Sequence, residues 1–270
     1  MNIYYQGNPG SYMHGASEAI APYLSNQSGD IIGKPDFSEV WESIGEEHIG
    51  VLAIENSYMG SIHPNIYGFL KYDYKIIGEY YGPIEHCLCS KETDISQITQ
   101  AYSQIPALEQ CHKYLQGKNI EPIVFSDTAL SAKYLSENDI PGTAAICSVQ
   151  AAKLYGLNIL DTNIADQNGN TTRFALITGQ ENKIVYGKKS NKMSLIFTAK
   201  NIPSSLHKCL GVFAQKEINL TKIESLPSYG NAFEYMFWID IEGNSQESNI
   251  SEAVKSLEDF AKNIKIIGEY

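Results

Sequence analysis

The segment Ile49-Gly-Val-Leu-Ala-Ile-Glu-Asn-Ser57 decides how this chain is interpreted, because a run of apolar and small residues leads directly into three polar ones. An unbroken apolar run bounded by turn residues is typical of a strand buried on both faces of a sheet. In α/β proteins, ligands bind beyond the carboxyl ends of such strands. The segment therefore predicts an α/β fold with a ligand site near Glu55, Asn56 and Ser57.

Strand-like and helix-like segments alternate on both sides of this strand, from residue 1 to about residue 180. The other predicted strands are Met1–Tyr5, Lys75–Tyr80, Glu85–Ser90, Gln100–Ser103, Pro122–Ser126, Thr143–Ile146 and Phe174–Thr178. The predicted helices are Tyr12–Leu24, Pro64–Lys71, Ala107–Gln116, Ala129–Ser136 and Ser148–Tyr155. Such alternation favours an α/β domain with a largely parallel sheet.

The pattern changes at residues 180–191, which are polar and charged and resemble a linker. The strands predicted after it are Lys192–Ala199, Ile218–Ser225, Phe233–Ile241 and Lys262–Tyr270, and the helices are Leu206–Lys216 and Asn249–Phe260. This β-α-β-β-α-β order is that of a ferredoxin-like module. A length of 270 residues accommodates two domains of the usual size.

The composition is that of a globular protein, with 43% hydrophobic and 19% charged residues. No apolar run is long enough for a membrane helix, and Met1–Gly7 lacks the features of a secretory signal. The net charge of −11 argues against nucleic acid and anionic membranes as partners. Five scattered cysteines suggest no disulfide framework, so we expect a cytoplasmic protein.

The chain shows neither a P-loop nor a dinucleotide-binding motif, and its six histidines are isolated. We therefore expect no metal and no cofactor. His86 and Cys87 are adjacent, as are Cys111 and His112. Adjacent side chains on a strand or helix point apart, so buried apolar thiols are favoured over a thiol–imidazole pair.

Three polar loops follow predicted strands, at Gln6–Tyr12, Glu55–Ser61 and Ser126–Ser131. Their hydroxyls, amides and glycines predict a cleft that holds an anionic ligand through dipoles. Arg173 is the only arginine, against nineteen lysines. Because the chain otherwise uses lysine, this arginine indicates a position that requires a planar guanidinium group, which can form two hydrogen bonds to one carboxylate. That carboxylate could belong to a ligand or to a buried ion pair.

Several sequence blocks, taken in order along the chain, resemble the prephenate dehydratase family with its C-terminal ACT regulatory domain. The blocks are Gln6–Tyr12, Ala53–Ser57, Leu108–Cys111, Asp127–Ala129, Thr172–Phe174 and, for the ACT signature, Glu217–Pro227. The resemblance implies decarboxylating dehydration of prephenate to phenylpyruvate in L-phenylalanine biosynthesis, without a cofactor. It also implies a bilobed, periplasmic-binding-protein-like catalytic domain at 1–181 and an ACT domain at 192–270. One lobe would hold about 1–80 and 160–181, and the other about 81–159.

Carried over residue by residue, the resemblance gives a candidate site. The residues it implies for catalysis are Thr172, Glu55, Asn56 and Gln110, with Thr172 as the donor to the leaving hydroxyl. Those it implies for substrate binding are Ser57, Thr128, Arg173 and Phe174. Neighbours on a strand point to opposite faces. If Thr172 faces the substrate, Arg173 faces away, which favours a structural ion pair for it.

The resemblance also implies an L-phenylalanine site, and homodimers or homotetramers formed through the ACT domain. The residues expected at that site are His207, Asn219, Leu220, Glu224 and Ser225. The chain departs from the family pattern at Gln104, where the family has histidine, at Ser204, where it has glycine, and at Leu226, where it has arginine.

Two further functions fit the same residues. An arogenate dehydratase would act on the substrate that carries an amino group in place of the keto group. A non-catalytic carboxylate or amino-acid binding protein would use the same cleft without turnover. A separate alternative is a degenerate sensor that acts only through binding at the ACT domain.

Overall fold

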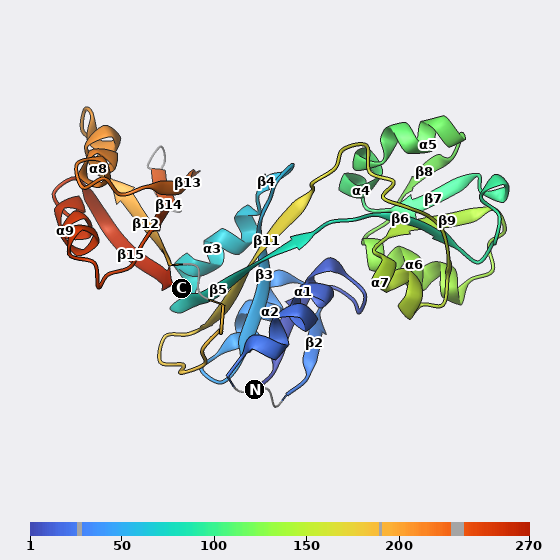
Figure 1. Cartoon of the computed structure of the whole chain (residues 1–270), viewed down its shortest axis with the longest axis horizontal. Helices are drawn as coiled ribbons and strands as arrows, with labels where there is room; N and C mark the ends of the chain where they lie inside the picture. The colour runs from blue at the N-terminus through green and yellow to red at the C-terminus, as the bar shows by residue number, and fades with distance from the viewer. Residues whose placement is uncertain (26–28, 189–190, 228–234) are drawn as a thin grey trace.

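The computed structural model describes residues 1–25, 29–188, 191–227 and 235–270. Figure 1 shows three units in a row. We call them lobe 1 (residues 1–83 and 171–188), lobe 2 (residues 87–162) and the C-terminal domain (residues 192–270). Two chain segments, 84–86 and 163–170, cross between the lobes. The sheet of lobe 2 extends to Thr162, past the boundary expected near residue 159.

Lobe 1 is built on one end of a ten-stranded sheet. Its strands are β1 (Ile3–Gln6), β2 (Ile31–Lys34), β3 (Ile49–Asn56), β4 (Gly60–Ser61), β5 (Tyr74–Pro83) and β11 (Thr171–Gly179). They lie in the order β5-β11-β3-β1-β2, with β4 paired to β3. Its helices are α1 (Tyr12–Ile20), η1 (Ala21–Tyr23), α2 (Phe37–Ile44) and α3 (His63–Lys71). The apolar part of β3 is fully buried, as its sequence predicts.

Lobe 2 has a separate five-stranded sheet in the order β10-β6-β9-β7-β8. The strands are β6 (Cys87–Ser90), β7 (Gln100–Ser103), β8 (Glu121–Val124), β9 (Thr143–Cys147) and β10 (Asn158–Thr162). The helices are η2 (Ile95–Gln97), α4 (Ile105–Gln110), α5 (His112–Lys118), α6 (Thr128–Glu137) and α7 (Val149–Leu154).

Both sheets are mixed, so the expectation of a largely parallel sheet is wrong. Within the lobes, parallel pairs join β1 to β2 and β3, and β7 to β8 and β9. In contrast, β11 runs antiparallel to β3 and β5, and β6 runs antiparallel to β9 and β10. Parallel neighbours need a crossover connection. Strands β5, β6, β10 and β11 instead adjoin the segments that cross between the lobes, and within the lobes they pair with neighbours that run the opposite way.

The helix predicted at Ala107–Gln116 is two helices that meet at Cys111. The cause lies in the second crossing segment. The carboxylate of Asp166 accepts the backbone N–H groups of Lys113 and Tyr114 and so caps α5. The backbone N–H of Asp166 donates to the carbonyl oxygen of Gln110 at 2.7 Å. The break therefore places Gln110 at the end of α4, next to the crossing segment.

The C-terminal domain has the expected β-α-β-β-α-β order. Its elements are β12 (Lys192–Ala199), α8 (Ser205–Ala214), β13 (Leu220–Pro227), β14 (Tyr235–Glu242), α9 (Ser248–Leu257) and β15 (Ala261–Glu269). The strand order is β13-β14-β12-β15, all antiparallel. Phe233, the expected first residue of one strand, lies outside the described residues, as do linker residues 189 and 190.

The two faces of the C-terminal sheet bury different partners. One face packs on α8 and α9 through an apolar cluster that includes Phe197, Phe213 and Leu257. The other packs on lobe 1, where the rings of Phe69 and Trp238 meet edge to face at 5.4 Å. Strand β15 also pairs with β5, so one sheet runs through both units. The C-terminal domain is thus docked on lobe 1 by a shared apolar core.

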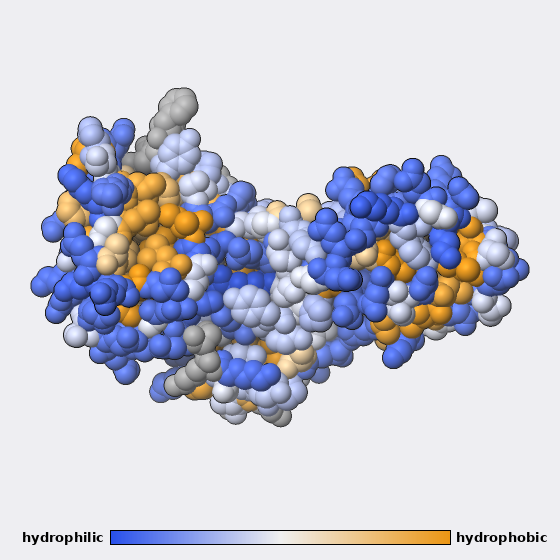
Figure 2. Space-filling model, turned by 45° about the horizontal axis from the view of Figure 1, so that its top comes forward, coloured by the Kyte–Doolittle hydropathy of each residue, from blue (hydrophilic) through white to orange (hydrophobic). Residues whose placement is uncertain are grey.

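The surface is uneven in polarity. Figure 2 shows hydrophobic residues gathered on the C-terminal domain at the left of the view, whereas the middle of the molecule is mostly hydrophilic on this face. Exposed apolar side chains of the C-terminal domain include Ile202, Ile223 and Tyr235. Within the described ranges, no helix has the length and apolar character needed to cross a membrane.

Candidate functional site

Strands β3 and β11 carry the predicted site residues on two opposite faces. Asn56 pairs with Thr172, and Glu55 pairs with Arg173. Directly paired residues point to the same face, and consecutive residues point to opposite faces. We call the face with Asn56 and Thr172 the site face, and the face with Glu55 and Arg173 the junction face. The sequence predicted this split for Thr172 and Arg173.

A chain of six hydrogen-bonded side chains lies on the site face, and we call it the site chain. Its members are Tyr12, His86, Gln110, Asn170, Asn56 and Thr172. In that order, the successive contacts are 2.8, 2.9, 3.0, 2.7 and 2.9 Å. The chain joins lobe 1, both crossing segments and lobe 2, so residues far apart in sequence form one polar unit.

Backbone contacts fix the direction of the hydrogen bonds that Asn56 and Asn170 make in the site chain. The side-chain oxygen of Asn56 accepts the backbone N–H groups of Tyr58 and Met59, each at 3.0 Å. The amide nitrogen of Asn56 therefore donates to Asn170 and to Thr172. In the same way, the amide nitrogen of Asn170 donates to Oε1 of Gln110.

The hydroxyl of Thr172 is thereby set up as a donor. Its oxygen accepts from Asn56 at 2.9 Å. In the part of the chain that the structure describes, no acceptor is recorded for the Thr172 proton. Thr172 is 7% exposed, so its hydroxyl has largely enclosed surroundings. A hydroxyl held in this way can donate to an oxygen that develops negative charge.

The site chain carries no formal charge near neutral pH. Burial lowers the pKa of His86, which keeps the imidazole neutral. Burial also raises the pKa of Tyr12 well above its ordinary value. A cavity of about 270 Å³ lies between the two crossing segments and is lined by His86 and Asn170, among others. In the described ranges, no cluster of three or more His, Cys, Asp or Glu side chains has a geometry that would hold a metal ion.

Arg173 lies on the junction face and is 5% exposed. Its Nε donates to Glu79 at 2.8 Å, one terminal nitrogen donates to Asp240 at 2.5 Å, and the other donates to the hydroxyl of Tyr270 at 2.7 Å. Glu79 belongs to lobe 1, whereas Asp240 and Tyr270 belong to the C-terminal domain. The guanidinium therefore uses its planar fork to join two domains, which corresponds to the ion-pair alternative.

Glu55, expected around the substrate, also faces the junction. One of its oxygens lies 3.1 Å from Nζ of Lys222, on β13 of the C-terminal domain. The other lies 3.6 Å from Arg173. The strand register turns Glu55 away from Thr172, so it does not lie beside Thr172, where the resemblance places it.

Three other predicted site residues lie outside the site chain. Phe174 is 2% exposed and packs in the apolar core of lobe 1. The hydroxyl of Ser57 accepts the backbone N–H of Thr171 at 3.0 Å and ties β3 to β11. Thr128 is buried in the first turn of α6. Among the described residues, no hydrogen bond joins Thr128 to the site chain.

The loop at Gln6–Tyr12, expected to offer its N–H groups to a ligand, contacts lobe 2 instead. The carbonyl of Gly10 accepts the hydroxyl of Ser148 at 2.7 Å, and the carbonyl of Pro9 accepts that of Tyr155 at 2.8 Å. Gly10 has a φ of +88°, and a Cβ there would lie 2.8 Å from the Cα of Ala151. A glycine is needed for this close approach.

The predicted regulatory residues are dispersed over the C-terminal domain. His207 lines a cavity of about 310 Å³ beside the start of α8. Asn219 and Leu220 lie at the start of β13. Glu224 points to lobe 1 instead, where it bonds to His63 at 3.0 Å and to Ser61 at 2.9 Å.

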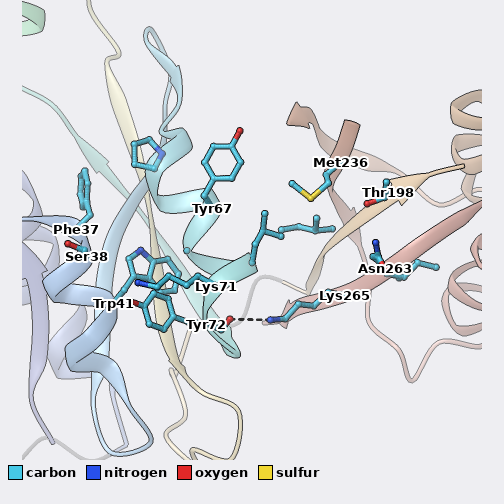
Figure 3. A pocket seen from close by; sticks show the side chains of 15 residues that line it. Phe37, Ser38, Trp41, Tyr67, Lys71, Tyr72, Thr198, Met236, Asn263 and Lys265 are labelled. Atoms are coloured by element: carbon cyan, nitrogen blue, oxygen red, sulfur yellow. Dashed lines mark hydrogen bonds between the residues drawn. The ribbon is translucent and has the colours of Figure 1, made fainter. Parts of the chain in front are cut away.

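A larger groove lies between lobe 1 and the C-terminal domain, away from the site chain. Its volume is about 880 Å³. Figure 3 shows Trp41, Tyr67 and Tyr72 on one side, and Met236 and Lys265 on the other. The Lys265 ammonium donates to the carbonyl of Tyr72 across one end. The groove separates α2 and α3 from the C-terminal sheet, and it contains none of the predicted catalytic residues.

Sequence reasoning missed three members of the site chain: Tyr12, His86 and Asn170. His86 was set aside because its neighbour Cys87 points elsewhere, but its partners come from α1 and α4. Tyr12 and Asn170 stand inside or beside quoted motif blocks, so their position there was an available signal. The contact of His86 with Gln110 required knowledge of the fold.

The comparison with protein families finds one match over most of the chain. A family model described as prephenate dehydratase matches residues 3–182. A prephenate dehydratase from Methanocaldococcus jannaschii is 35% identical over 97% of this chain and 94% of its own length. A chloroplast arogenate dehydratase/prephenate dehydratase from Arabidopsis thaliana is 32% identical over 100% of this chain and 72% of its own length.

A solved structure has the same arrangement. The prephenate dehydratase of Arthrobacter aurescens, determined in complex with L-Phe, matches with a TM-score of 0.86. Its sequence is 25% identical, and the match covers 100% of this chain and 89% of that one. The likeness therefore extends through lobe 1, lobe 2 and the C-terminal domain.

Proposed function

This chain belongs to the prephenate dehydratase family, and we propose that the site chain carries its reaction, the conversion of prephenate to phenylpyruvate. The protein is a dehydratase, which is a carbon–oxygen lyase. One observation carries the assignment of the site. The Thr172 oxygen accepts from Asn56, and no acceptor for its proton is recorded among the described residues, which leaves that proton available to a substrate.

The reaction requires a hydrogen-bond donor to the departing hydroxyl more than it requires a base. The bond to the ring carboxylate breaks, carbon dioxide leaves, and the electron pair enters the ring. The carbon–oxygen bond opposite breaks, the hydroxyl leaves as water with a proton supplied by the solution, and the ring becomes aromatic. Thr172 donates a hydrogen bond to the departing oxygen as charge develops on it. Since aromatisation drives the step, side chains that align the donor are sufficient.

Substrate binding would use neutral donors. Both hydrogen-bond donors that reach Gln110, from His86 and Asn170, converge on its Oε1. The amide nitrogen of Gln110 is then free to bind a carboxylate. In the described part of the chain, no hydrogen bond of that nitrogen to another residue is recorded. Because the site is uncharged, no cation has to be buried. Fixed dipoles of the side-chain amides would bind the substrate carboxylate instead.

Prephenate is favoured over arogenate by the charge of the site chain. Arogenate carries an ammonium group, which a carboxylate would recognise. None of the six members of the site chain is acidic, and Glu55 points to the junction face, so Glu85, which lines the cavity between the crossing segments, is the carboxylate nearest to that role. The Arabidopsis relative is named for both substrates, so arogenate turnover is the alternative to measure.

The C-terminal domain is proposed to be an ACT domain that binds L-phenylalanine as an inhibitor. The β-α-β-β-α-β topology and the L-Phe complex of the Arthrobacter relative support this. The effector would contact His207, Asn219, Leu220 and Ser225, in homodimers or homotetramers formed through the C-terminal sheet. Strand β13 lies at the end of that sheet, and its Ile223 is 49% exposed.

A series of polar contacts joins the C-terminal domain to strand β3, which carries Asn56. Lys222 bonds to Glu55 at 3.1 Å and to Ser61 at 2.9 Å, and Glu224 bonds to Ser61 and His63. Glu55 directly precedes Asn56, which orients Thr172. A shift of β13 on effector binding would therefore move the end of β3.

The test is steady-state turnover by the full chain. Phenylpyruvate formation from prephenate, corrected for spontaneous decay, should be saturable and should exceed turnover of arogenate. L-phenylalanine should inhibit it, and Lys222→Met should weaken that inhibition while leaving turnover without effector in place. Binding of prephenate without turnover would instead support the non-catalytic binding protein.

A further inference from the structure

His86 is a buried polar residue at the point where the first crossing segment enters lobe 2. The side chain is 2% exposed. Its Nδ1 lies 2.8 Å from the hydroxyl of Tyr12, and its Nε2 lies 2.9 Å from Oε1 of Gln110. The rings of His86 and Tyr12 also meet edge to face at 5.6 Å. Both ring nitrogens are therefore engaged, although the imidazole has no part in the reaction described above.

We propose that His86 is a positioning residue of the dehydratase, which holds the side-chain amide of Gln110 with its N–H₂ group toward the substrate. The inference rests on the proposed function, because it assigns Gln110 to substrate binding. It adds a residue that acts through Gln110 and does not itself touch the reacting atoms.

The orientation of Gln110 follows from hydrogen-bond directions. Asn56 is fixed by two backbone N–H groups, so it presents its nitrogen to Asn170. Asn170 then presents its nitrogen to Gln110. With Oε1 of Gln110 as the acceptor, His86 must donate from Nε2. Reversal of the Gln110 amide would turn its N–H₂ group toward the amide nitrogen of Asn170 and leave that buried donor unpaired.

Tyr12 completes the arrangement. An imidazole that carries its proton on Nε2 has an acceptor at Nδ1. The Tyr12 hydroxyl lies 2.8 Å from that nitrogen and 2.8 Å from the carbonyl oxygen of Glu85, and its one proton can serve either acceptor. Burial lowers the pKa of His86, which favours this neutral form. The tautomer that donates to Gln110 is therefore set from the other side, because Asn170 donates to Oε1 of Gln110 and makes that oxygen the acceptor facing Nε2.

The location of His86 between the lobes explains why its hydrogen bond to Gln110 matters. Tyr12 lies on α1 of lobe 1, Gln110 lies on α4 of lobe 2, and His86 lies in the segment between the lobes. Gln110 would otherwise be a flexible side chain at the end of a helix. Two donors from the two crossing segments, His86 and Asn170, hold it in one orientation. The substrate therefore meets a donor that is already aligned.

This role predicts a particular kinetic signature. A carboxylate bound by Gln110 is present in both the bound substrate and the transition state. Loss of such uniform binding raises KM and leaves kcat nearly unchanged. Thr172 acts on the departing oxygen, so changes there lower kcat. A merely structural role for His86 would not separate the two parameters.

Two substitutions distinguish the two nitrogens of His86. The amide nitrogen of His86→Gln reaches the position of Nε2 and keeps the donor to Gln110. His86→Asn reaches only the position of Nδ1 and loses that donor. We expect His86→Asn to raise KM for prephenate by about 10- to 100-fold, with little change in kcat. His86→Gln should restore most of the loss. His112→Asn, at an exposed histidine of α5, is the matched control.

A readout independent of turnover completes the test. Nitrogen-15 NMR of the histidine side chains, without substrate, should show His86 neutral and protonated at Nε2. A proton on Nδ1, or equal KM values for His86→Asn and wild type, would overturn the inference while the dehydratase assignment stands. Absence of wild-type turnover would instead overturn the proposed function, and the NMR tautomer would still test the geometry.

Discussion

Replacing Arg173 with methionine removes the one guanidinium that joins lobe 1 to the C-terminal domain. Methionine has a similar length and no charge. The substitution leaves Asp240 without a cationic partner among the described contacts, although Ser194 and Trp238 still donate to it. Glu79 keeps Lys192 at 2.7 Å. The main loss is therefore at Asp240, which is 0% exposed.

The size of the effect follows from burial. Removing one partner of a buried ion pair costs about 3–5 kcal/mol, because the remaining charge stays buried without compensation. Exposed pairs contribute about 0–1 kcal/mol. Arg173 and Asp240 both belong to the first class, so Arg173→Met should lower the free energy of unfolding by about 3–5 kcal/mol. Arg173→Lys should lose less, since one ammonium replaces one of three contacts.

Urea unfolding followed by fluorescence measures this, because the chain has two tryptophans, one on each side of the junction. Trp41 reports lobe 1, and Trp238 reports the C-terminal domain. Each signal is isolated by replacing the other tryptophan with phenylalanine. In wild type the two transitions should coincide. In Arg173→Met the Trp238 transition should come first, because the junction is weakened.

The double variant Arg173→Met/Asp240→Asn is the control, since it removes both charges. It should recover part of the lost stability, with a coupling energy above about 1 kcal/mol. A loss below about 1 kcal/mol in Arg173→Met, together with additive effects in the double variant, would refute the assignment of Arg173 to a buried interdomain ion pair.

Three further outcomes are expected. Ser204 has a φ of +64° before α8, so Ser204→Gly should raise the free energy of unfolding by about 1 kcal/mol in the same urea assay. An unchanged midpoint would contradict left-handed strain. Gly10→Ala should separate the lobes and raise KM, because its Cβ would strike Ala151; Gly117→Ala, with open space around it, should not. Since the folded-state pKa of His86 lies below 6.5, the unfolded chain binds the extra proton. Its stability contribution is present above pH 6.5 and is lost as pH falls toward the folded-state pKa. The melting temperature should therefore decrease less steeply with falling pH in His86→Gln than in wild type. An equal pH dependence in the two proteins would contradict the contribution assigned to His86.

Local patterns predicted most elements of the fold. The strand at Ile49–Asn56 and the helices at α3, α6 and α7 follow directly from apolar runs, caps and spacing. Helix α2 was missed, although Phe37, Val40, Trp41 and Ile44 have helical spacing. The antiparallel direction of β11 could not be predicted from the sequence, because it depends on how the chain returns from lobe 2.

The site was only partly predictable for the same reason. Motif positions led to Thr172, Asn56 and Gln110, which the fold brings together. Glu55 stands in the same motif but lies on the junction face, since neighbours on a strand point apart. The role of the junction face depends on the C-terminal domain that packs on it, and local sequence patterns do not encode this packing. Contacts between segments far apart in sequence carry the information that local patterns lack.

The most direct test of the central claim compares Thr172→Val with Thr172→Ser in single-turnover formation of phenylpyruvate from prephenate. Valine keeps the shape and removes the donor, whereas serine keeps the hydroxyl. The site chain predicts that Thr172→Val is slower than wild type by about 10²- to 10⁴-fold, with substrate binding retained. Thr172→Ser should keep most of the rate. A valine variant that turns over prephenate like wild type would contradict Thr172 as the donor.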